Sequence, residues 1–279
     1  MRLTSLAFIL ILTISNAFAL TNSSPAVSND WTNVMQIKSE APDSRGDSTP
    51  GYCNATLINE NVLITAAHCV KLAYISGMKK IEIQVGQYKY ITRKTDGQVV
   101  RIGYVEKTRL TKEVHVELPR SLTDKIARRG EKATIEPSED MALLWWNEET
   151  PEFANIVIAD IVSPTEHSSM IKNLPQASLL SVTINPFSEM STDTKRMATL
   201  NDFKWKNYVY SKSISRVEEG DSGAPLFAQI NGKFKIFAVV KGRASTVFDN
   251  WDAYSSINPN ACEIANRLPT FIKIEACKK

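Results

Sequence analysis

Short apolar segments separated by turn-forming residues recur along most of this 279-residue chain. They are rich in β-branched and aromatic residues, and most are too short for a helix of ordinary length. Examples are NVLITAAH, IEIQVGQYKYI, VVRIGYV, DMALLWW, APLFAQI and FKIFAVV. Asn231-Gly232, between two such runs, is a specific signal for a β-hairpin. The pattern predicts an all-β fold.

Two segments depart from this strand pattern. The residues from Glu106 to Pro137 are charged and poorly periodic, and we interpret them as an insertion between strands. The last segment, ACEIANRLPTFIKIEACKK, predicts a C-terminal helix that begins after Pro269. That helix would place Phe271, Ile272 and Ile274 toward the interior.

The first 19 residues have the features of a signal peptide. Arg2 precedes an apolar run from Leu6 to Ile14, and Ala17-Phe18-Ala19 has the small-x-small form of a cleavage site. The run is shorter than the roughly 20 apolar residues of a membrane-spanning helix. We therefore expect cleavage after Ala19, a leader or extended arm over residues 20–30, and a secreted or periplasmic protein.

The charge balance and the histidine positions exclude several kinds of partner. The formal net charge is +3 at pH 7, which is too small to indicate nucleic acid or an anionic membrane as a partner. The three histidines are widely separated and give no metal-ligand spacing. We expect no metal and no other cofactor.

Four cysteines in an exported chain predict disulfide bonds, with three pairings open from the residues alone. Their positions, at Cys53, Cys69, Cys262 and Cys277, favour two local pairs. Asn54-Ala55-Thr56 also fits a glycosylation acceptor in such a chain.

The run EEGDSGAPLF raises the question whether Ser222 is a nucleophile or part of an ordinary turn. A serine hydroxyl needs a histidine base, an acid that orients the base, and donors for the oxyanion that forms. His68 follows a predicted strand, whereas His115 and His167 lie in polar surroundings. Asp140 directly precedes the strand DMALLWW, which would hold its carboxylate beside buried surface.

The segments GYCNATLI, LITAAHC, DMALL and GDSGAP occur in this order and resemble the motifs of the chymotrypsin-like (trypsin-like) serine endopeptidase family. The resemblance runs from about Trp31 to the C-terminus. It implies a protease domain over residues 31–279, built from two six-stranded antiparallel β-barrels with the active site in the cleft between them. The first barrel would extend to about residue 150 and the second would begin at about residue 151.

The resemblance gives each candidate residue a role. Ser222 would attack the scissile carbonyl, His68 would take and return the proton, and Asp140 would orient the imidazole. The N–H groups of Gly220 and Ser222 would form the oxyanion hole.

The implied activity is that of a secreted endopeptidase that cleaves proteins or peptides. The alternative is a catalytically inactive homologue that serves as a binding or adaptor protein. As partners we expect protein or peptide substrates and a protein inhibitor, with no nucleic acid, no membrane span and a monomeric state.

The resemblance also bears on the cysteines and on activation. Cys53 and Cys69 stand where the family bridges the loop that carries the histidine, which leaves Cys262 with Cys277. Family zymogens commonly expose an Ile-Val-Gly-Gly amine that pairs with the aspartate before the serine, here Asp221. No such segment follows a basic residue near the start of this chain, so activation by the usual cut is not expected.

The substrate pocket departs from the family at a charged position. Arg216 lies where trypsin-like members carry the aspartate that attracts lysine or arginine. A guanidinium pointing into the pocket would favour cleavage after Glu or Asp. Alternatively, Glu218 or Glu219 would neutralise it and leave a small or apolar pocket. Lys241 and Arg243, near the position of the family's Ser-Trp-Gly, favour acidic substrates.

Overall fold

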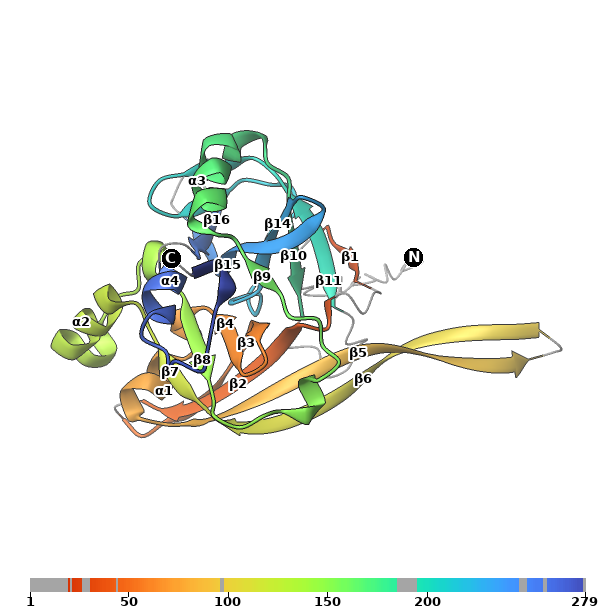
Figure 1. Ribbon diagram of the computed structural model, residues 1–279, viewed down its shortest axis with the longest axis horizontal. Coiled ribbons are helices and arrows are strands. Elements are labelled where there is room, and N and C mark those ends of the chain that lie inside the picture. Colours follow the sequence, from red (N-terminus) through yellow and green to blue (C-terminus); the bar gives the residue numbers. More distant parts are fainter. Residues whose placement is uncertain are drawn as a thin grey trace, which may run out of the picture.

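The computed structural model describes residues 20, 22–26, 31–43, 45–95, 98–184, 195–245, 250–257 and 260–277. Nearly half of these residues belong to two curled sheets that lie against each other (Figure 1). In the first sheet the strand order is β6-β5-β2-β3-β4-β8-β7, and all neighbours are antiparallel. Its strands are β2 (Val34–Pro42), β3 (Ser48–Asn59), β4 (Val62–Thr65), β5 (Lys80–Thr95), β6 (Gln98–Glu113), β7 (His115–Glu117) and β8 (Ala142–Trp145).

The second sheet has the order β1-β11-β10-β14-β15-β16-β13-β12, and β9 pairs parallel to β15. Its strands are β1 (Ser24–Pro25), β9 (Asp160–Ile161), β10 (Leu179–Thr183), β11 (Arg196–Leu200), β12 (Phe203–Trp205), β13 (Val209–Ser211), β14 (Pro225–Ile230), β15 (Lys233–Ser245) and β16 (Asn250–Ser256). The all-β prediction is confirmed. The described sheets have seven and nine strands rather than six each, because short strands join at their edges.

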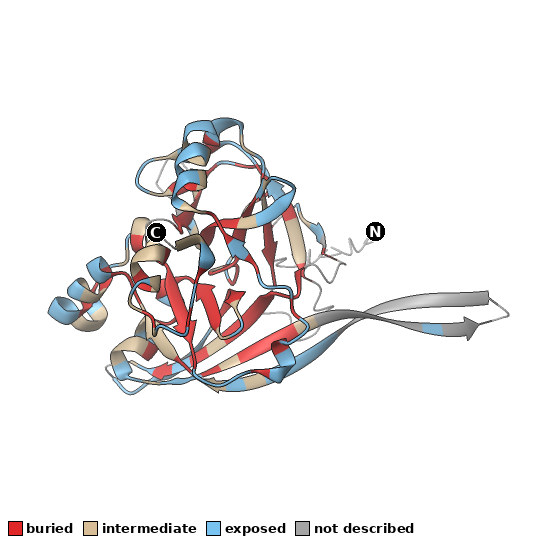
Figure 2. Ribbon diagram, in the orientation of Figure 1, coloured by how far each residue is buried: buried red, intermediate tan, exposed pale blue. Residues whose placement is uncertain are grey.

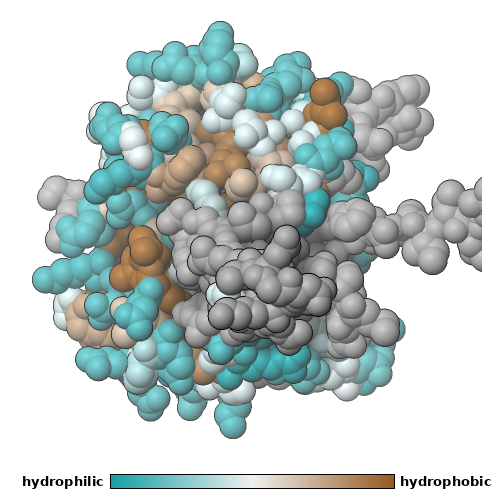
Figure 3. Space-filling view, turned by 90° about the vertical axis from the view of Figure 1, so that its right-hand side faces the viewer, coloured by the Kyte–Doolittle hydropathy of each residue, from teal (hydrophilic) through white to brown (hydrophobic). Residues whose placement is uncertain are grey.

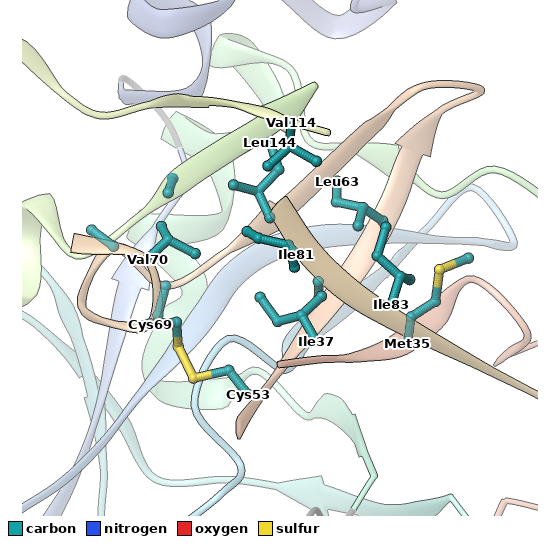
Figure 4. Close-up of a cluster of buried hydrophobic side chains, with 14 of the residues drawn as sticks. Met35, Ile37, Cys53, Leu63, Cys69, Val70, Ile81, Ile83, Val114 and Leu144 are labelled. Carbon is teal, nitrogen blue, oxygen red and sulfur yellow. A yellow bond between two sulfur atoms is a disulfide. The ribbon is translucent and has the colours of Figure 1, made fainter. Parts of the chain in front are cut away.

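The first sheet curls around an apolar core. Alternate residues of its strands point inward, as expected for half-buried β-structure, and the buried side chains include Ile37, Leu63 and Ile83 (Figure 4). The Cys53–Cys69 disulfide lies at one end of this cluster and joins β3 to the 3-10 helix η2 (Ala67–Cys69). The core therefore supports the segment that carries His68.

A second apolar cluster joins the two sheets. It brings Val62 and Ile64 of β4 into one buried group with Phe227 of β14 and Ile236 and Val239 of β15. The buried residues follow the strands through the middle of the molecule, whereas the helices outside them are largely exposed (Figure 2). This shared core fixes the position of one sheet relative to the other.

Among the described residues, four α-helices lie outside the sheets: α1 (Lys71–Ser76), α2 (Arg120–Arg129), α3 (Pro164–Asn173) and α4 (Asn260–Ala265). In the described part of the chain, none is both long and apolar enough to cross a bilayer. Hydrophilic side chains make up most of the described surface on the face drawn in Figure 3.

The interpretation of Glu106 to Pro137 as an insertion between strands is correct only for the later part of this segment, which lies between β7 and β8. Its first residues continue β6, which pairs with β5 in a hairpin that extends far beyond the body of the molecule (Figure 1). Its middle contains helix α2, in which Leu122 and Ile126 are buried. Two apolar residues spaced by four are enough to dock a helix. The charged residues around them obscured this helical periodicity in the sequence.

The C-terminal helix also differs in position from the prediction. Helix α4 ends at Ala265, and the segment from Asn266 to Phe271 forms turns, one of them closed by the Ile272 N–H donating to the Pro269 carbonyl at 2.9 Å. Ile272 and Ile274 are buried as expected, whereas Phe271 is 59% exposed. The second disulfide, Cys262–Cys277, ties α4 to the 3-10 helix η7 (Glu275–Cys277).

Candidate functional site

His68 and Asp140 are brought together by the pairing of β4 with β8. Thr65 at the end of β4 lies opposite Ala142 at the start of β8. His68 follows β4 in η2, and Asp140 precedes β8, directly after the 3-10 helix η4 (Pro137–Glu139). In an antiparallel pair the end of one strand adjoins the start of the other, so the two side chains meet at one edge of the sheet.

Two hydrogen bonds hold this pair. The His68 Nδ1 atom lies 2.8 Å from Asp140 Oδ2, and the His68 backbone N–H donates to Asp140 Oδ1 at 2.9 Å. The carboxylate is fully buried, whereas 34% of the imidazole side chain is exposed. With Nδ1 held by the carboxylate, Nε2 is the ring atom left to accept a proton from a reacting group.

The protonation state of Asp140 follows from its neighbours. Burial by itself would raise the pKa of this carboxyl, but the hydrogen bond from His68 and the charges of His68 and Lys241 outweigh burial, so the pKa lies below its ordinary value. Asp140 is therefore ionised near neutral pH and can stabilise an imidazolium.

Ser222 comes from the second sheet, in the loop before β14. Its hydroxyl donates to the carbonyl oxygen of Lys241 at 3.3 Å, and Lys241 Nζ lies 3.1 Å from Asp140 Oδ2. Lys241 thus links the Ser222 loop to the histidine–aspartate pair. Within the described residues, no hydrogen bond joins Ser222 directly to His68.

Two glycines allow the Ser222 loop to take its shape. Gly220 has φ +94°, a conformation that disfavours any side chain. Gly223 has φ +78°, and a Cβ atom there would lie 2.1 Å from the Asn54 carbonyl oxygen and 2.4 Å from Thr65 Oγ1. In the described part of the chain, neither the N–H of Gly220 nor that of Ser222 has an acceptor. Both are available as donors at the predicted oxyanion hole.

Asn54 is a positioning residue that the sequence analysis missed. Its backbone N–H donates to the Ser222 carbonyl at 2.7 Å, and its side-chain Nδ2 donates to the Gly220 carbonyl at 2.9 Å. Its Oδ1 accepts from the N–H of Ile184 at 2.7 Å. The side chain is fully buried, so this amide holds the loop and is inaccessible to a glycan in the folded protein. The available signal was a polar residue directly beside Cys53, in the part of β3 whose other residues, 53 and 55–58, are buried.

Asp221 connects the same loop to the N-terminal arm. Its Oδ2 accepts hydrogen bonds from the N–H groups of Leu20, at 2.9 Å, and Glu218, at 2.8 Å. Burial raises the pKa of this carboxyl to about 7. The N–H of Glu218, the Thr183 side chain and the N–H of Leu20 oppose part of this shift. Leu20 is fully buried. Its backbone nitrogen lies beside Asp221, the residue for which the sequence indicated no partner amine.

Each of the three cations assigned to the substrate pocket contacts a carboxylate. Arg216 Nε lies 3.1 Å from Asp252 Oδ2, and Arg243 lies 2.9 Å from Glu218. Lys241 turns toward Asp140. Asp252 is a partner that the sequence analysis did not consider.

Asp252 lies on β16 and is fully buried. Its carboxylate also accepts the N–H of Val217 at 3.1 Å. Burial raises the pKa of this carboxyl, although the bonds from Val217 and Arg216 oppose the shift. The charge at the position of Arg216 is therefore balanced within the protein.

His68 also groups with Cys53 and Cys69, with ligand-type atoms within 4.8 Å of one another. Both sulfur atoms belong to the disulfide, whose S–S distance is 2.01 Å. A disulfide sulfur is not a thiolate and does not serve as a metal ligand of the usual kind.

Two comparisons with known proteins bear on this arrangement. A family model described as Trypsin matches residues 21–247, which include His68, Asp140, Gly220 and Ser222. No curated protein matches the chain. The family match covers most of the sequence and agrees with the two curled antiparallel sheets described above.

Proposed function

Because this chain belongs to the trypsin family, we propose that it is a secreted serine endopeptidase that hydrolyses peptide bonds through Ser222, His68 and Asp140. The observation that carries the proposal is the His68–Asp140 pair, held at 2.8 Å beside the loop of Ser222. A buried, ionised carboxylate on Nδ1 leaves Nε2 as a base for the serine hydroxyl.

In the proposed reaction, Ser222 Oγ attacks the carbonyl carbon of the scissile bond while its proton moves to His68 Nε2. The serine hydroxyl first rotates away from the Lys241 carbonyl, which it contacts at 3.3 Å, and toward the imidazole. Hydrogen bonds between catalytic groups commonly shorten only when substrate binds. The N–H groups of Gly220 and Ser222 receive the oxyanion. The imidazolium then protonates the leaving amine, and water releases the acyl group by the same steps in reverse.

A serine-reactive phosphonate separates this enzyme from an inactive adaptor of the same fold. We expect the folded protein to gain one phosphonyl group on Ser222, located by peptide mass mapping, because only an activated hydroxyl reacts with such probes. Heat-denatured protein and Ser222→Ala serve as controls. A folded protein that gains no label at Ser222 would favour the adaptor function.

We propose that residues 1–19 are a signal peptide and that cleavage after Ala19 releases the protein to a secreted or periplasmic location. Residues 20–30 would be an N-terminal leader or arm, followed by the protease domain over residues 31–279, with one barrel to about residue 150 and one from about residue 151. Leu20 would become the first residue, with its nitrogen 2.9 Å from Asp221 Oδ2. The new α-amine would pair with this buried carboxylate, so that signal-peptide removal also completes the active site.

We further propose that the residue before the cleaved bond is uncharged, because Arg216 is neutralised by Asp252 at 3.1 Å. Wild-type enzyme should cleave Leu substrates faster than Glu or Arg substrates. Arg216→Ala should raise the relative kcat/KM for Arg substrates about tenfold or more, since it leaves the buried Asp252 carboxylate without its cation.

The matched control for this prediction is the double variant Arg216→Ala/Asp252→Ala, which should not gain the preference for Arg. Wild-type preference for Glu, lost in Arg216→Ala, would instead assign Arg216 to direct recognition of acidic substrates.

A further inference from the structure

A bulge in β15 places Lys241 between the two halves of the candidate site. In the pairing of β15 with β16, Val240 lies opposite Tyr254 and Gly242 lies opposite Ala253. Between these two pairs the register advances by one residue in β16 but by two residues in β15. Lys241 is therefore the extra residue of a β-bulge. Bulges re-aim side chains, and they are common next to active sites.

The side chain of Lys241 reaches the buried acid of the first sheet. Its Nζ lies 3.1 Å from Asp140 Oδ2 and donates to the carbonyl oxygen of Ile135 at 3.1 Å. Its own carbonyl accepts the hydroxyl of Ser222. Because His68 Nδ1 contacts the same Oδ2 atom at 2.8 Å, one carboxylate oxygen is shared by the imidazole and the ammonium.

We propose that Lys241 is a positioning residue that sets the proton affinity of His68 through their shared carboxylate partner. A carboxylate facing only an imidazole favours the imidazolium, because opposite charges stabilise each other. The Lys241 ammonium offsets part of that negative charge. The imidazole therefore stays neutral, and competent as a base, to lower pH than it would beside an unpaired Asp140.

The charged groups around the site indicate that Lys241 is the cation that offsets the charge of Asp140. Among the described residues, the charged groups that lower the pKa of Asp140 are His68, from η2, and Lys241, from β15. Asp221, which directly precedes Ser222 in the chain, is held by the N–H groups of Leu20 and Glu218.

Two other cations of the candidate pocket are held by carboxylates of their own. Arg243, further along β15, contacts Glu218, and Arg216 contacts Asp252 of β16. The Lys241 side chain is 27% exposed and Asp140 is fully buried, so solvent screens their interaction only partly.

This inference rests on the proposed function only for its consequence in catalysis, and its test therefore uses a readout that needs no activity. The His68 ring is titrated by NMR in the Ser222→Ala background, with its resonances assigned by comparison with a His68→Ala spectrum. Lys241→Met should raise the titration midpoint of His68 by about one pH unit. In the active enzyme, the acidic limb of the kcat/KM profile should move to higher pH by the same amount.

Three substitutions separate charge from hydrogen bonding. Lys241→Arg keeps the cation and should titrate like wild type, whereas Lys241→Gln keeps a donor without charge and should shift like Lys241→Met. The matched control is Lys235→Met, which removes a lysine of similar exposure on the same strand that pairs with Glu166 and should leave the midpoint unchanged.

A wild-type midpoint in Lys241→Gln or Lys241→Met overturns the proposal. If the neutral variants do not fold, the coupling is measured with Lys241 intact: the His68 resonances should show a second step at alkaline pH, when the lysine loses its proton. A titration without that step also overturns the proposal. If the midpoints shift as expected but the protein has no peptidase activity, the proposed function fails and this inference stands.

Discussion

Replacing Ser222 with alanine is expected to lower kcat for peptide hydrolysis by a factor on the order of 10⁶, the loss seen when a member of a comparable catalytic triad is removed. The folded structure and export should be unaffected, because among the described residues the hydroxyl makes one hydrogen bond, to the Lys241 carbonyl at 3.3 Å. His68→Ala should have a similar effect. Without the nucleophile or its base, the remaining groups cannot form an acyl-enzyme.

The double variant Ser222→Ala/His68→Ala should be scarcely slower than either single variant, because the residues act as one unit. Ser168→Ala is a matched control: this serine also donates to a backbone carbonyl, that of Pro164, but on helix α3. It should keep full activity. Steady-state kinetics on a peptide substrate measure all four proteins, and full activity in Ser222→Ala would remove the proposed site.

A single extra residue before Leu20 is expected to lower kcat/KM by roughly a hundred- to a few thousandfold. The reason is the burial of Asp221, whose carboxylate would lose the α-ammonium group of Leu20 as its partner. Breaking a buried ion pair costs about 3–5 kcal/mol, which corresponds to this range of rate if the active loop conformation depends on the pair. The measurement compares protein that begins at Leu20 with protein that carries one added N-terminal glycine.

Asp221→Asn should cause a similar loss, and the added glycine should have little further effect in that variant because both changes remove one interaction. One glycine added after Lys279 is the matched control and should be silent. If the N-terminally extended protein is as active as the protein that begins at Leu20, the α-amine has no part in activity.

The same pair predicts how stability depends on pH. Without the amine, the pKa of Asp221 is raised to about 7, so the folded state binds a proton that the unfolded state has already released. The free energy of unfolding of the extended protein should therefore fall as the pH rises from about 4 to about 7. With the α-ammonium group in place the ionised carboxylate is stabilised, and this fall should shrink or reverse. Denaturant titrations of both proteins across this range measure the difference.

Local signals in the sequence determined the fold class and the identity of the candidate catalytic residues. Strand-length apolar runs with turn residues between them predict antiparallel sheets, since a period of two is the geometry of a half-buried strand. His68 and Asp140 could be selected because each flanks such a run, and Ser222 because Gly220 and Gly223 bracket it. These signals depend only on neighbours along the chain.

The contacts that complete the site were decided by the tertiary structure alone. Leu20 meets Asp221 across 201 residues, Asn54 meets Gly220 across 166, and Lys241 meets Asp140 across 101. Each contact depends on which strands pair and in which register. The contact of Lys241 with Asp140 also depends on a β-bulge that no local sequence pattern predicts. A charged or polar side chain has the same sequence signature whether it faces solvent or a buried partner. Only the packing of the two sheets distinguishes a side chain that faces solvent from one that faces a buried partner.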